Sequence, residues 1–343
     1  MTTTKIAVYG ATGHTGSYLL TELQRRGITP ILVGRSASRM RAAAEAAGIP
    51  DADIRVATLT DHHALVAAFT GADAVISSLS AYVRNGEPVL AAAIAAGAHY
   101  TDLSGEQLFL KRVFDEYGAK AEAAGVTVIP GVTDNNVAGD LLAHLTARHL
   151  TGPVEIVLSH LSKSGGNGSK GSAKTVFASL DWFRSGGWHF RDGELRTGTA
   201  RHTEMTFPGH TAATTVAKFA QPPVITIPRH TDVSYVEGVL DTAILDLLGS
   251  FTEEIIESLP DEPSSDLRYD VVVDAYDTNG HSVRGVVSGV DSYRDSALEA
   301  VEIAVRLTEG TTKPGTLSVA EAFDAEELLD ALAHFAITWR ITE

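Results

Sequence analysis

The chain has 343 residues, of which 44% are hydrophobic and 20% charged, with no cysteine and a formal net charge of −16. These values predict a globular protein of one or two domains and exclude disulfides, thiolate metal sites and cysteine nucleophiles. We expect no nucleic-acid partner, because an acidic chain lacks the basic face that phosphates require. We also expect a cytoplasmic location and no membrane partner, because the chain shows no long apolar run and no signal-peptide pattern.

The first predicted elements are a buried strand over residues 6–9 and an amphipathic helix over 17–26, joined by a turn with the spacing G-x-x-G-x-x-G. Such a turn directs free N–H groups and the positive end of the helix dipole at one point, which favours a phosphate. Its three glycines permit the tight turn, the close approach of a pyrophosphate, and the packing of helix on strand. An ordinary turn is the alternative, but strand and helix both stand where a dinucleotide motif requires them. The residues expected to bind the dinucleotide here are Gly10, Ala11, Thr12, Gly13, His14, Thr15 and Gly16.

The second predicted strand, over residues 30–34, ends where dinucleotide-binding folds usually place an acidic residue for the ribose 2′-hydroxyl. This chain has Arg35 at that point, followed by Ser36 and Arg39. A guanidinium pairs with a 2′-phosphate, whereas a carboxylate repels it. We therefore predict NADP as the cofactor, bound by Gly34, Arg35, Ser36 and Arg39; the alternative is that both arginines are ordinary surface charges.

Strands and helices continue to alternate up to about residue 135. Further strands are expected at 53–58, 74–78, 99–103 and 126–130, with one helix beginning at Pro88 and another spanning 107–124. This alternation predicts an α/β fold with a Rossmann doubly wound parallel sheet. Ligands of such sheets lie beyond the C-terminal strand ends, so the loops at 77–82, which includes Ser77 and Ser78, at 102–106 and at 130–136 are expected to face the cofactor.

The order of these motifs resembles the saccharopine dehydrogenase-like family. The resemblance lies in the runs 86–89 and 95–106, in the turn 130–135, where Asp134 is an addition, and more faintly in 313–318. It implies a Rossmann domain joined to a second domain, a homodimer formed through that second domain, and NADP-dependent reduction of an imine or an activated C=C bond in a small molecule. Saccharopine reductases and trans-acting enoyl reductases are both members.

A second family shares the glycine-rich turn, the isoflavone-reductase-like atypical short-chain dehydrogenases, some of which bind NADP as sensors without catalysis. Residues 98–102 do not resemble the corresponding segment of that family. It stays as the alternative, beside a non-catalytic NADP-binding sensor and a structural subunit that retains the fold.

The second half of the sequence changes character and predicts an α+β domain with a largely antiparallel sheet. Turns over 191–194 and 277–280 predict hairpins, the second joining strands over 267–276 and 281–290, and residues 260–266 read as an exposed connector. We expect an NADP-binding Rossmann domain over 1–135 and a domain for substrate binding and dimerisation over 136–315. A C-terminal segment over 316–343 is expected to pack back on the Rossmann domain.

Reduction of a double bond needs a proton donor or a fixed polar group beside the hydride acceptor. The candidates on loops expected to face the cofactor are Tyr82, Tyr100, Asp102 and Asp134, although each residue type is also common in purely structural roles. Tyr100 and Asp102 alternate along one strand and therefore share a face.

One further candidate for chemistry is the glycine-rich run 162–172, which carries Lys163 and Lys170 ahead of an apolar helix. Such a run suits a carboxylate or phosphate of an anionic substrate, and a solvated loop is the alternative. The histidines show no metal-binding spacing and no G-x-S-x-G elbow occurs, so neither a metal site nor serine hydrolase chemistry is expected.

Overall fold

The computed structural model describes residues 4–163, 169–250, 252–259 and 268–343. The chain divides into two compact units. The first contains the residues up to 104 together with 108–133 and 293–317, and the second contains 105–107, 134–292 and 318–343.

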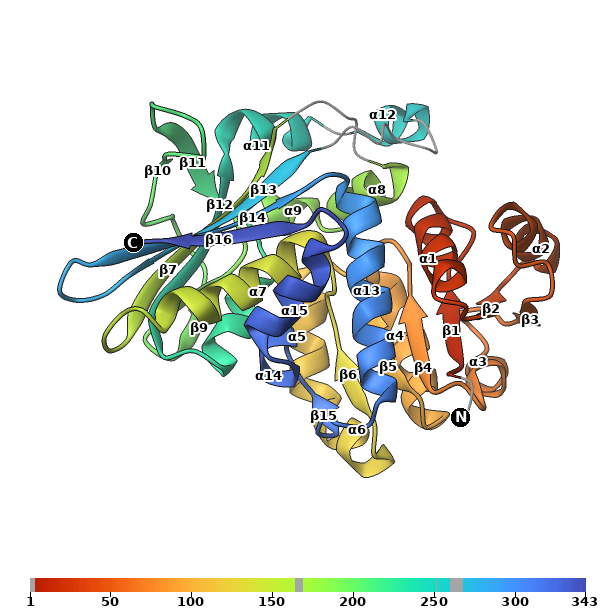
Figure 1. Ribbon diagram of the computed structural model, residues 1–343. Coiled ribbons are helices and arrows are strands. Elements are labelled where there is room, and N and C mark those ends of the chain that lie inside the picture. Colours follow the sequence, from red (N-terminus) through yellow and green to blue (C-terminus); the bar gives the residue numbers. More distant parts are fainter. Residues whose placement is uncertain (1–3, 164–168, 251, 260–267) are drawn as a thin grey trace. The chain divides into compact units, whose positions relative to one another are not determined.

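The first unit is built on a seven-stranded sheet, and its described strand pairs are all parallel (Figure 1). The strand order is β15-β6-β5-β4-β1-β2-β3, so the direction of winding reverses at β1. This confirms the predicted doubly wound Rossmann sheet. The strands are β1 Ile6–Tyr9, β2 Ile31–Gly34, β3 Asp53–Val56, β4 Ala74–Ser77, β5 His99–Asp102, β6 Thr127–Ile129 and β15 Gly315–Thr316.

Helices α2 and α3 of this unit each begin after a residue whose side chain accepts a first-turn N–H group. The side chain of Ser36 accepts the N–H of Arg39 at 3.4 Å, and that of Asp61 accepts the N–H of Ala64 at 2.9 Å. The helices are α1 His14–Arg25, α2 Ala37–Ala46, α3 His62–Phe69, α4 Tyr82–Ala95, α5 Gln107–Glu116, α6 Gly118–Ala124 and α13 Ser292–Thr308.

Two helix predictions are corrected. Helix α4 begins at Tyr82 and holds Pro88 in its interior, because the buried Tyr82 hydroxyl anchors the first turn to backbone N–H groups of neighbouring loops. Pro88 removes only one donor from the helix ladder. The helix expected over 107–124 is two helices, separated at Tyr117.

The chain returns to the first sheet through residues 293–317, which differs from the expected boundary. Strand β15 pairs with β6, and the Thr127 hydroxyl donates to the carbonyl of Lys313 at 2.9 Å. Residues 318–343, expected on the Rossmann domain, belong to the second unit, where β16 (Thr338–Thr342) pairs with β14. Each of these two short strands is thus placed by the strand edge with which it pairs, which local sequence does not specify.

The second unit is built on a nine-stranded mixed sheet in the order β10-β11-β12-β7-β13-β14-β16, with the hairpin β8–β9 attached to β12. Only β12 and β7 are parallel among its described strand pairs, so the predicted, largely antiparallel sheet is confirmed. The remaining strands are β7 Val154–Ser162, β8 His189–Arg191, β9 Glu194–Arg196, β10 Glu204–Met205, β11 Thr214–Lys218, β12 Val233–Asp241, β13 Tyr269–Tyr276 and β14 Ser282–Gly289.

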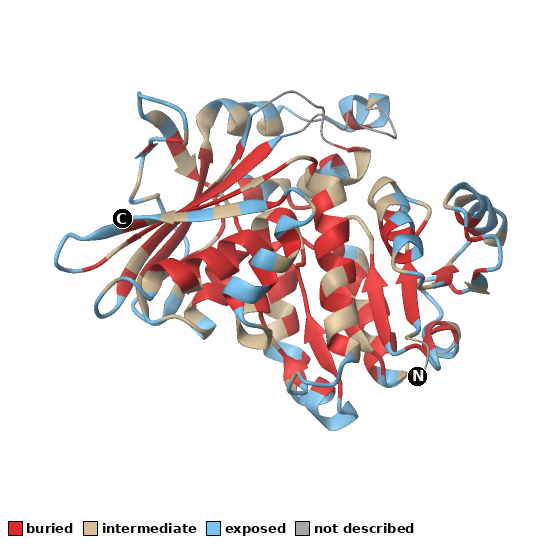
Figure 2. Ribbon diagram, in the orientation of Figure 1, coloured by how far each residue is buried: buried red, intermediate tan, exposed pale blue. Residues whose placement is uncertain are grey.

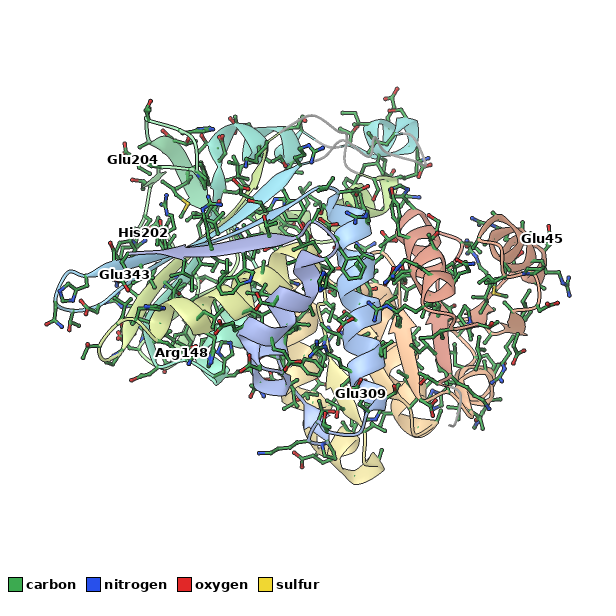
Figure 3. The ribbon with its side chains drawn as sticks, viewed as in Figure 1. Glu45, Arg148, His202, Glu204, Glu309 and Glu343 are labelled. Atoms are coloured by element: carbon green, nitrogen blue, oxygen red, sulfur yellow. The ribbon has the colours of Figure 1, made fainter. Side chains whose placement is uncertain are left out.

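Helix α7 of the second unit packs against β13 and β14, and an apolar cluster that includes Val157, Phe207 and Val272 forms a second part of the core. Strands of both sheets are largely buried (Figure 2), while carboxylates such as Glu45 and Glu309 in the first unit and Glu204 in the second project into solvent (Figure 3). The helices are α7 Asp134–Ala147, α8 Lys170–Ala178, α9 Leu180–Arg184, α10 Pro223–Thr226, η1 Ile227–Arg229, α11 Thr242–Gly249, α12 Glu253–Ser258, α14 Val319–Ala322 and α15 Ala325–Ala333.

Both predicted hairpin turns are present. Asp192 and Gly193 adopt φ values of 49° and 88°, the pair of left-handed residues that a two-residue hairpin loop requires. In the second turn the Asp277 carboxylate accepts the N–H groups of Asn279 at 2.8 Å and His281 at 3.0 Å. The expected connector over 260–266, and residue 267, lie outside the described residues.

Two buried charged clusters stabilise the second unit. Glu237 accepts the N–H groups of Arg201 and His202, the His202 ring at 2.7 Å and the Tyr235 hydroxyl at 2.8 Å. Asp140 contacts His230 at 2.8 Å. Burial favours the neutral form of both groups, but their attraction prevails: it holds the pKa of Asp140 below, and the pKa of His230 above, the usual values.

Candidate functional site

The glycine-rich turn between β1 and α1 leaves the start of the helix open to a ligand. Gly13 precedes the first helical residue and provides no side chain to cap it. The first-turn N–H groups therefore have no capping partner from that position. Gly10 adopts φ +92°, and a Cβ there would lie 2.0 Å from the carbonyl oxygen of Ser78. Gly10 is thus required by the turn itself.

The second and third glycines of the motif differ in what requires them. A Cβ at Gly16 would lie 2.6 Å from the Gly10 carbonyl oxygen, so the packing of α1 on the turn excludes a side chain. At Gly13 the nearest atom would be 3.5 Å away, which is ordinary contact, and the residue is exposed. The protein leaves room for a side chain at Gly13 but carries none, as expected where a pyrophosphate approaches the backbone.

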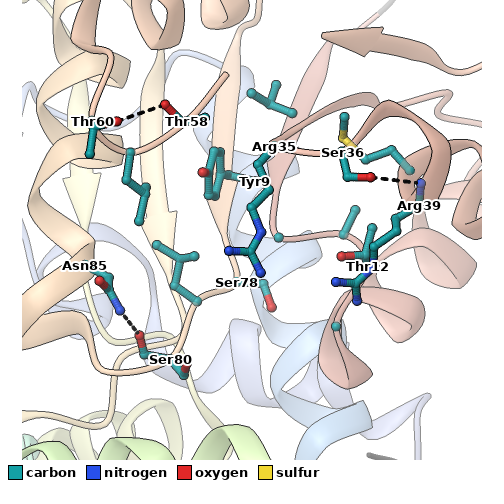
Figure 4. Close-up of a pocket in the computed structure, with 18 residues that line it drawn as sticks. Tyr9, Thr12, Arg35, Ser36, Arg39, Thr58, Thr60, Ser78, Ser80 and Asn85 are labelled. Atoms are coloured by element: carbon teal, nitrogen blue, oxygen red, sulfur yellow. Dashed lines mark hydrogen bonds between the residues drawn. The ribbon is translucent and has the colours of Figure 1, made fainter. Parts of the chain in front are cut away.

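A pocket of about 600 Å³ opens at this turn (Figure 4). Its volume is in the range of ligand-binding sites. The pocket collects residues from the C-terminal ends of β1, β2, β3 and β4, on both sides of the strand where winding reverses. Ligands of doubly wound sheets bind at this position.

Two arginines supply positive charge to the pocket. Arg35 extends past Tyr9 towards Ser78, and Arg39 extends towards Thr12 (Figure 4). Burial raises the pKa of the Tyr9 hydroxyl, and the nearby positive charge of Arg35 opposes this rise. Within the described ranges neither arginine forms an ion pair with a carboxylate, so both charges are available to an anion.

Most residues expected to bind the cofactor lie together in the pocket. These are Gly10, Ala11, Thr12, Gly13, Gly34, Arg35, Ser36, Arg39 and Ser78. Four others do not line it: Ser77 is fully buried, Gly16 packs on the turn, Thr15 lies within α1, and the His14 ring contacts the rings of Tyr18 and Tyr293.

Several pocket residues were not anticipated. Their side chains mostly carry no distinctive sequence signal: Tyr9, Val33, Met40, Thr58, Leu59, Thr60 and Asn85. Leu79 and Ser80 also line the pocket, and both belong to the loop at 77–82 that was expected to face the cofactor. The end of β3 could have been included, since the C-terminal ends of parallel strands meet at one edge. The Thr58 and Thr60 hydroxyls bond to each other at 3.1 Å, and Asn85 donates to the Ser80 carbonyl at 2.9 Å.

Tyr82 and Tyr100 are placed as structural residues. The Tyr82 hydroxyl donates to the Ser77 carbonyl at 2.6 Å and accepts the N–H groups of Leu79 and Leu103. Burial, reinforced by the charge of Asp102, raises the pKa of each tyrosine well above its usual value. Both rings are almost completely buried, so neither hydroxyl reaches a ligand in the pocket.

Asp102 is also buried and organises the sheet edge. One of its carboxylate oxygens accepts the N–H groups of Ser104 and Gly131, each at 2.9 Å. These bonds fix the loops that follow β5 and β6. The predicted shared face of Tyr100 and Asp102 thus points into a polar cluster of the core.

Asp134 joins residues that are distant in sequence. Its carboxylate lies 3.1 Å from the His160 ring nitrogen Nε2 and accepts the Ser292 hydroxyl at 2.8 Å. His160 stacks on Tyr269 with ring centroids 5.1 Å apart, and its side chain is 19% exposed. The cluster therefore holds a histidine whose other ring nitrogen is directed away from the carboxylate. His160 was not anticipated.

The two lysines of the glycine-rich run already have carboxylate partners. Lys170 lies 3.5 Å from Glu257, which also binds Lys174, and Lys163 lies 2.8 Å from Asp270. The sequence predicted that this run, with its two lysines, suits an anionic substrate. That prediction did not include these ion pairs. Residues 164–168 of the run lie outside the described residues.

Two further findings concern metal ions and membrane spans. Among the described residues no group of three His, Asp or Glu side chains could hold a metal ion. In the same part of the chain, no helix combines the length and apolar character needed to cross a membrane.

The fold and the pocket define a dinucleotide-binding α/β protein. Residues 6–129 match the model of the saccharopine dehydrogenase NADP-binding domain. This part of the chain is therefore similar to that NADP-binding domain, in agreement with the resemblance in the sequence.

Curated relatives support the same assignment over part of their length. A putative trans-acting enoyl reductase of Mycobacterium tuberculosis is 30% identical over 186 residues, covering 53% of this chain and 42% of the relative. A lipid droplet localized protein of Caenorhabditis elegans is 27% identical over 189 residues, covering 51% and 44%. The chain thus spans less than half the length of these relatives.

One solved structure is similar to this protein over nearly the whole chain. The apo form of saccharopine dehydrogenase (L-Glu forming) from Saccharomyces cerevisiae has a TM-score of 0.65 and covers 99% of both chains, at 13% sequence identity. At this identity the comparison supports the fold alone.

Proposed function

We propose that this protein is an NADPH-dependent reductase of a small molecule. The observation that carries the proposal is the pocket at the glycine-rich turn, with Arg35 and Arg39 in its lining and no carboxylate at the end of β2. NADPH, when bound, supplies a hydride to a polarised double bond.

The residues present fit this cofactor. The open space at Gly13 and the first turn of α1 suit a pyrophosphate. Arg35 and Arg39 suit the 2′-phosphate, because a guanidinium can bind phosphate oxygens with two parallel bonds. The side chain of Ser36 caps α2, so its role towards the cofactor is to orient the loop that carries both arginines.

We infer that His160 holds the proton that completes the reduction and that Asp134 is its positioning residue. Asp134, His160 and Ser292 all belong to the second unit. The bond from Asp134 to Nε2 fixes the ring and leaves Nδ1 for proton transfer. Of the expected catalytic residues, Tyr82, Tyr100 and Asp102 are buried in the core. The remaining candidates are Asp134 and Lys170. Lys170 can bind a substrate anion only if that anion replaces Glu257 as its ion-pair partner.

The names of the relatives favour an activated C=C bond as the bond reduced, and an imine is the second candidate. A small molecule, not a protein or nucleic acid, is the expected substrate. A homodimer is also part of this proposal, and sedimentation velocity of the purified protein tests it.

The decisive experiment is the consumption of NADPH with a panel of α,β-unsaturated thioesters and ketones and a matched panel of cyclic and open-chain imines. Turnover with one panel assigns the bond. If NADPH binds but no compound in either panel is reduced, the sensor alternative replaces the reductase.

The proton role is tested by His160→Gln, with His281→Gln as a matched control. His281 also lies 3.1 Å from an aspartate carboxylate, but on an exposed hairpin turn. We expect His160→Gln to lower kcat by about 10²-fold or more with unchanged NADPH affinity, and His281→Gln to change neither. Equal kcat in both variants would remove His160 from the mechanism.

A further inference from the structure

Helix α11 of the second unit is apolar but lies open to solvent. Its sequence Thr-Ala-Ile-Leu-Asp-Leu-Leu-Gly contains one charged residue, and none of its residues is buried. Leu247 is 61% exposed. Figure 2 shows the helix without a buried segment, in contrast to the strands beside it. Contiguous exposed apolar surface can mark a binding site.

A pocket of about 510 Å³ lies between α11, the helices α8 and α9, and strand β11. All of these elements belong to the second unit. Within the pocket, Phe183 stacks on Phe219 with ring centroids 5.3 Å apart. Hydrocarbon makes up most of the lining, which also includes Val176, Leu180, Ala217, Leu245 and Leu248. A concave apolar site of this volume suits a small molecule, not a flat partner surface.

The charged residues of the lining favour an anion. Within the lining, Arg184 and Lys218 carry two positive charges, against one negative charge on the exposed Asp246; outside the lining, the buried Glu237 carboxylate lies near Lys218. Arg184 donates to the Gly249 carbonyl, and the buried Lys218 ammonium donates to the carbonyls of Gly187 and Gly198. Neither cation forms an ion pair with a carboxylate within the described part of the chain. Each has more donors than these bonds use, so an anionic group can be accommodated.

We propose that this pocket binds the hydrocarbon chain of a small anionic amphiphile, of the chemical class of a medium-chain fatty acid carboxylate. The chain lies on the aromatic pair and on Leu180 and Leu248, and Arg184 and Lys218 compensate the carboxylate. Burial lowers the pKa of Lys218 to about 8, which still leaves the ammonium charged at neutral pH. The site is separate from the NADP pocket and does not depend on the proposed reductase activity.

The test is calorimetric titration of the full-length protein, without NADPH, with decanoate, decan-1-ol and butyrate, each below its aggregation concentration. We expect saturable binding of one decanoate per chain, about tenfold weaker binding of the alcohol and no measurable binding of butyrate. Arg184→Gln should reduce the preference for decanoate over the alcohol. No saturable decanoate binding by the unmodified protein would overturn the proposal.

Two adjacent residues of α11 separate a pocket ligand from a partner that covers the outer face. Leu248 lines the pocket, whereas Leu247 does not line it and is exposed. Leu248→Ser should weaken decanoate about tenfold or more, and Leu247→Ser should change it less than twofold. Ala217→Phe, which fills the pocket, gives a second test if Leu248→Ser fails to fold. Equal losses at the two leucines, or undiminished binding by Ala217→Phe, would refute the pocket as the site.

Discussion

Replacing Gly13 by alanine separates cofactor binding from folding. The residue has φ −89° and ψ 172°, which alanine adopts without strain, and its added methyl would meet nothing closer than 3.5 Å. We therefore expect the free energy of unfolding to stay within about 1 kcal/mol of the parent value. The methyl group would instead occupy the space through which a pyrophosphate reaches the backbone N–H groups.

The expected result is that Gly13→Ala weakens NADPH at least about tenfold, which corresponds to about 1.4 kcal/mol. Fluorescence titration with NADPH measures the affinity, and urea unfolding of the same samples measures the stability. NADH should be weakened by a similar factor, since both cofactors carry the pyrophosphate.

The other glycines of the motif are the controls. An alanine at Gly16 would lie 2.6–2.7 Å from backbone atoms of Gly10 and Ala11, and an alanine at Gly10 would lie 2.0 Å from the Ser78 carbonyl oxygen. Backbone atoms cannot move aside as a side chain does, so both variants should lose about 2 kcal/mol or more of stability. If Gly13→Ala folds normally and binds NADPH as tightly as the parent, the pyrophosphate does not approach this turn and the reasoning fails.

The remaining predictions concern charge. Arg35→Ala should weaken NADPH binding by about 1–3 kcal/mol and leave NADH binding unchanged, as measured by titration. The control Arg41→Ala, at an exposed residue, should change neither affinity. Equal affinity of the unmodified protein for both cofactors would reject the assignment of NADP. Glu237→Ala should cost about 3–5 kcal/mol in urea unfolding, because four donors lose one buried acceptor. The raised pKa of His230 contributes stability that is complete below its ordinary pKa of about 6.5 and is lost as the pH rises through the raised value. The lowered pKa of Asp140 contributes stability that is lost as the pH falls through the lowered value. His230→Gln should therefore destabilise more at about pH 6 than at about pH 9, and equal losses would contradict the pair.

Local sequence determined the features that depend on neighbouring residues. The glycine-rich turn, the alternation of strands and helices, and the two hairpins follow from conformations that a few adjacent residues allow or forbid. The position of a positive charge near the turn could also be predicted from local sequence, because the end of β2 fixes where Arg35 lies relative to the turn. The sequence therefore predicted the NADP-binding unit and the character of the second sheet.

Tertiary structure alone decided which distant side chains meet. His160 reaches Asp134 across 26 residues and Ser292 reaches it across 158, while Lys170 pairs with Glu257. No periodicity or turn signal encodes such pairs, since each depends on how whole elements pack. The same holds for β15, which joins the first sheet, and for β16, which joins the second: both are short strands near the C-terminus, and the edge that each one pairs with is fixed by the folded sheets.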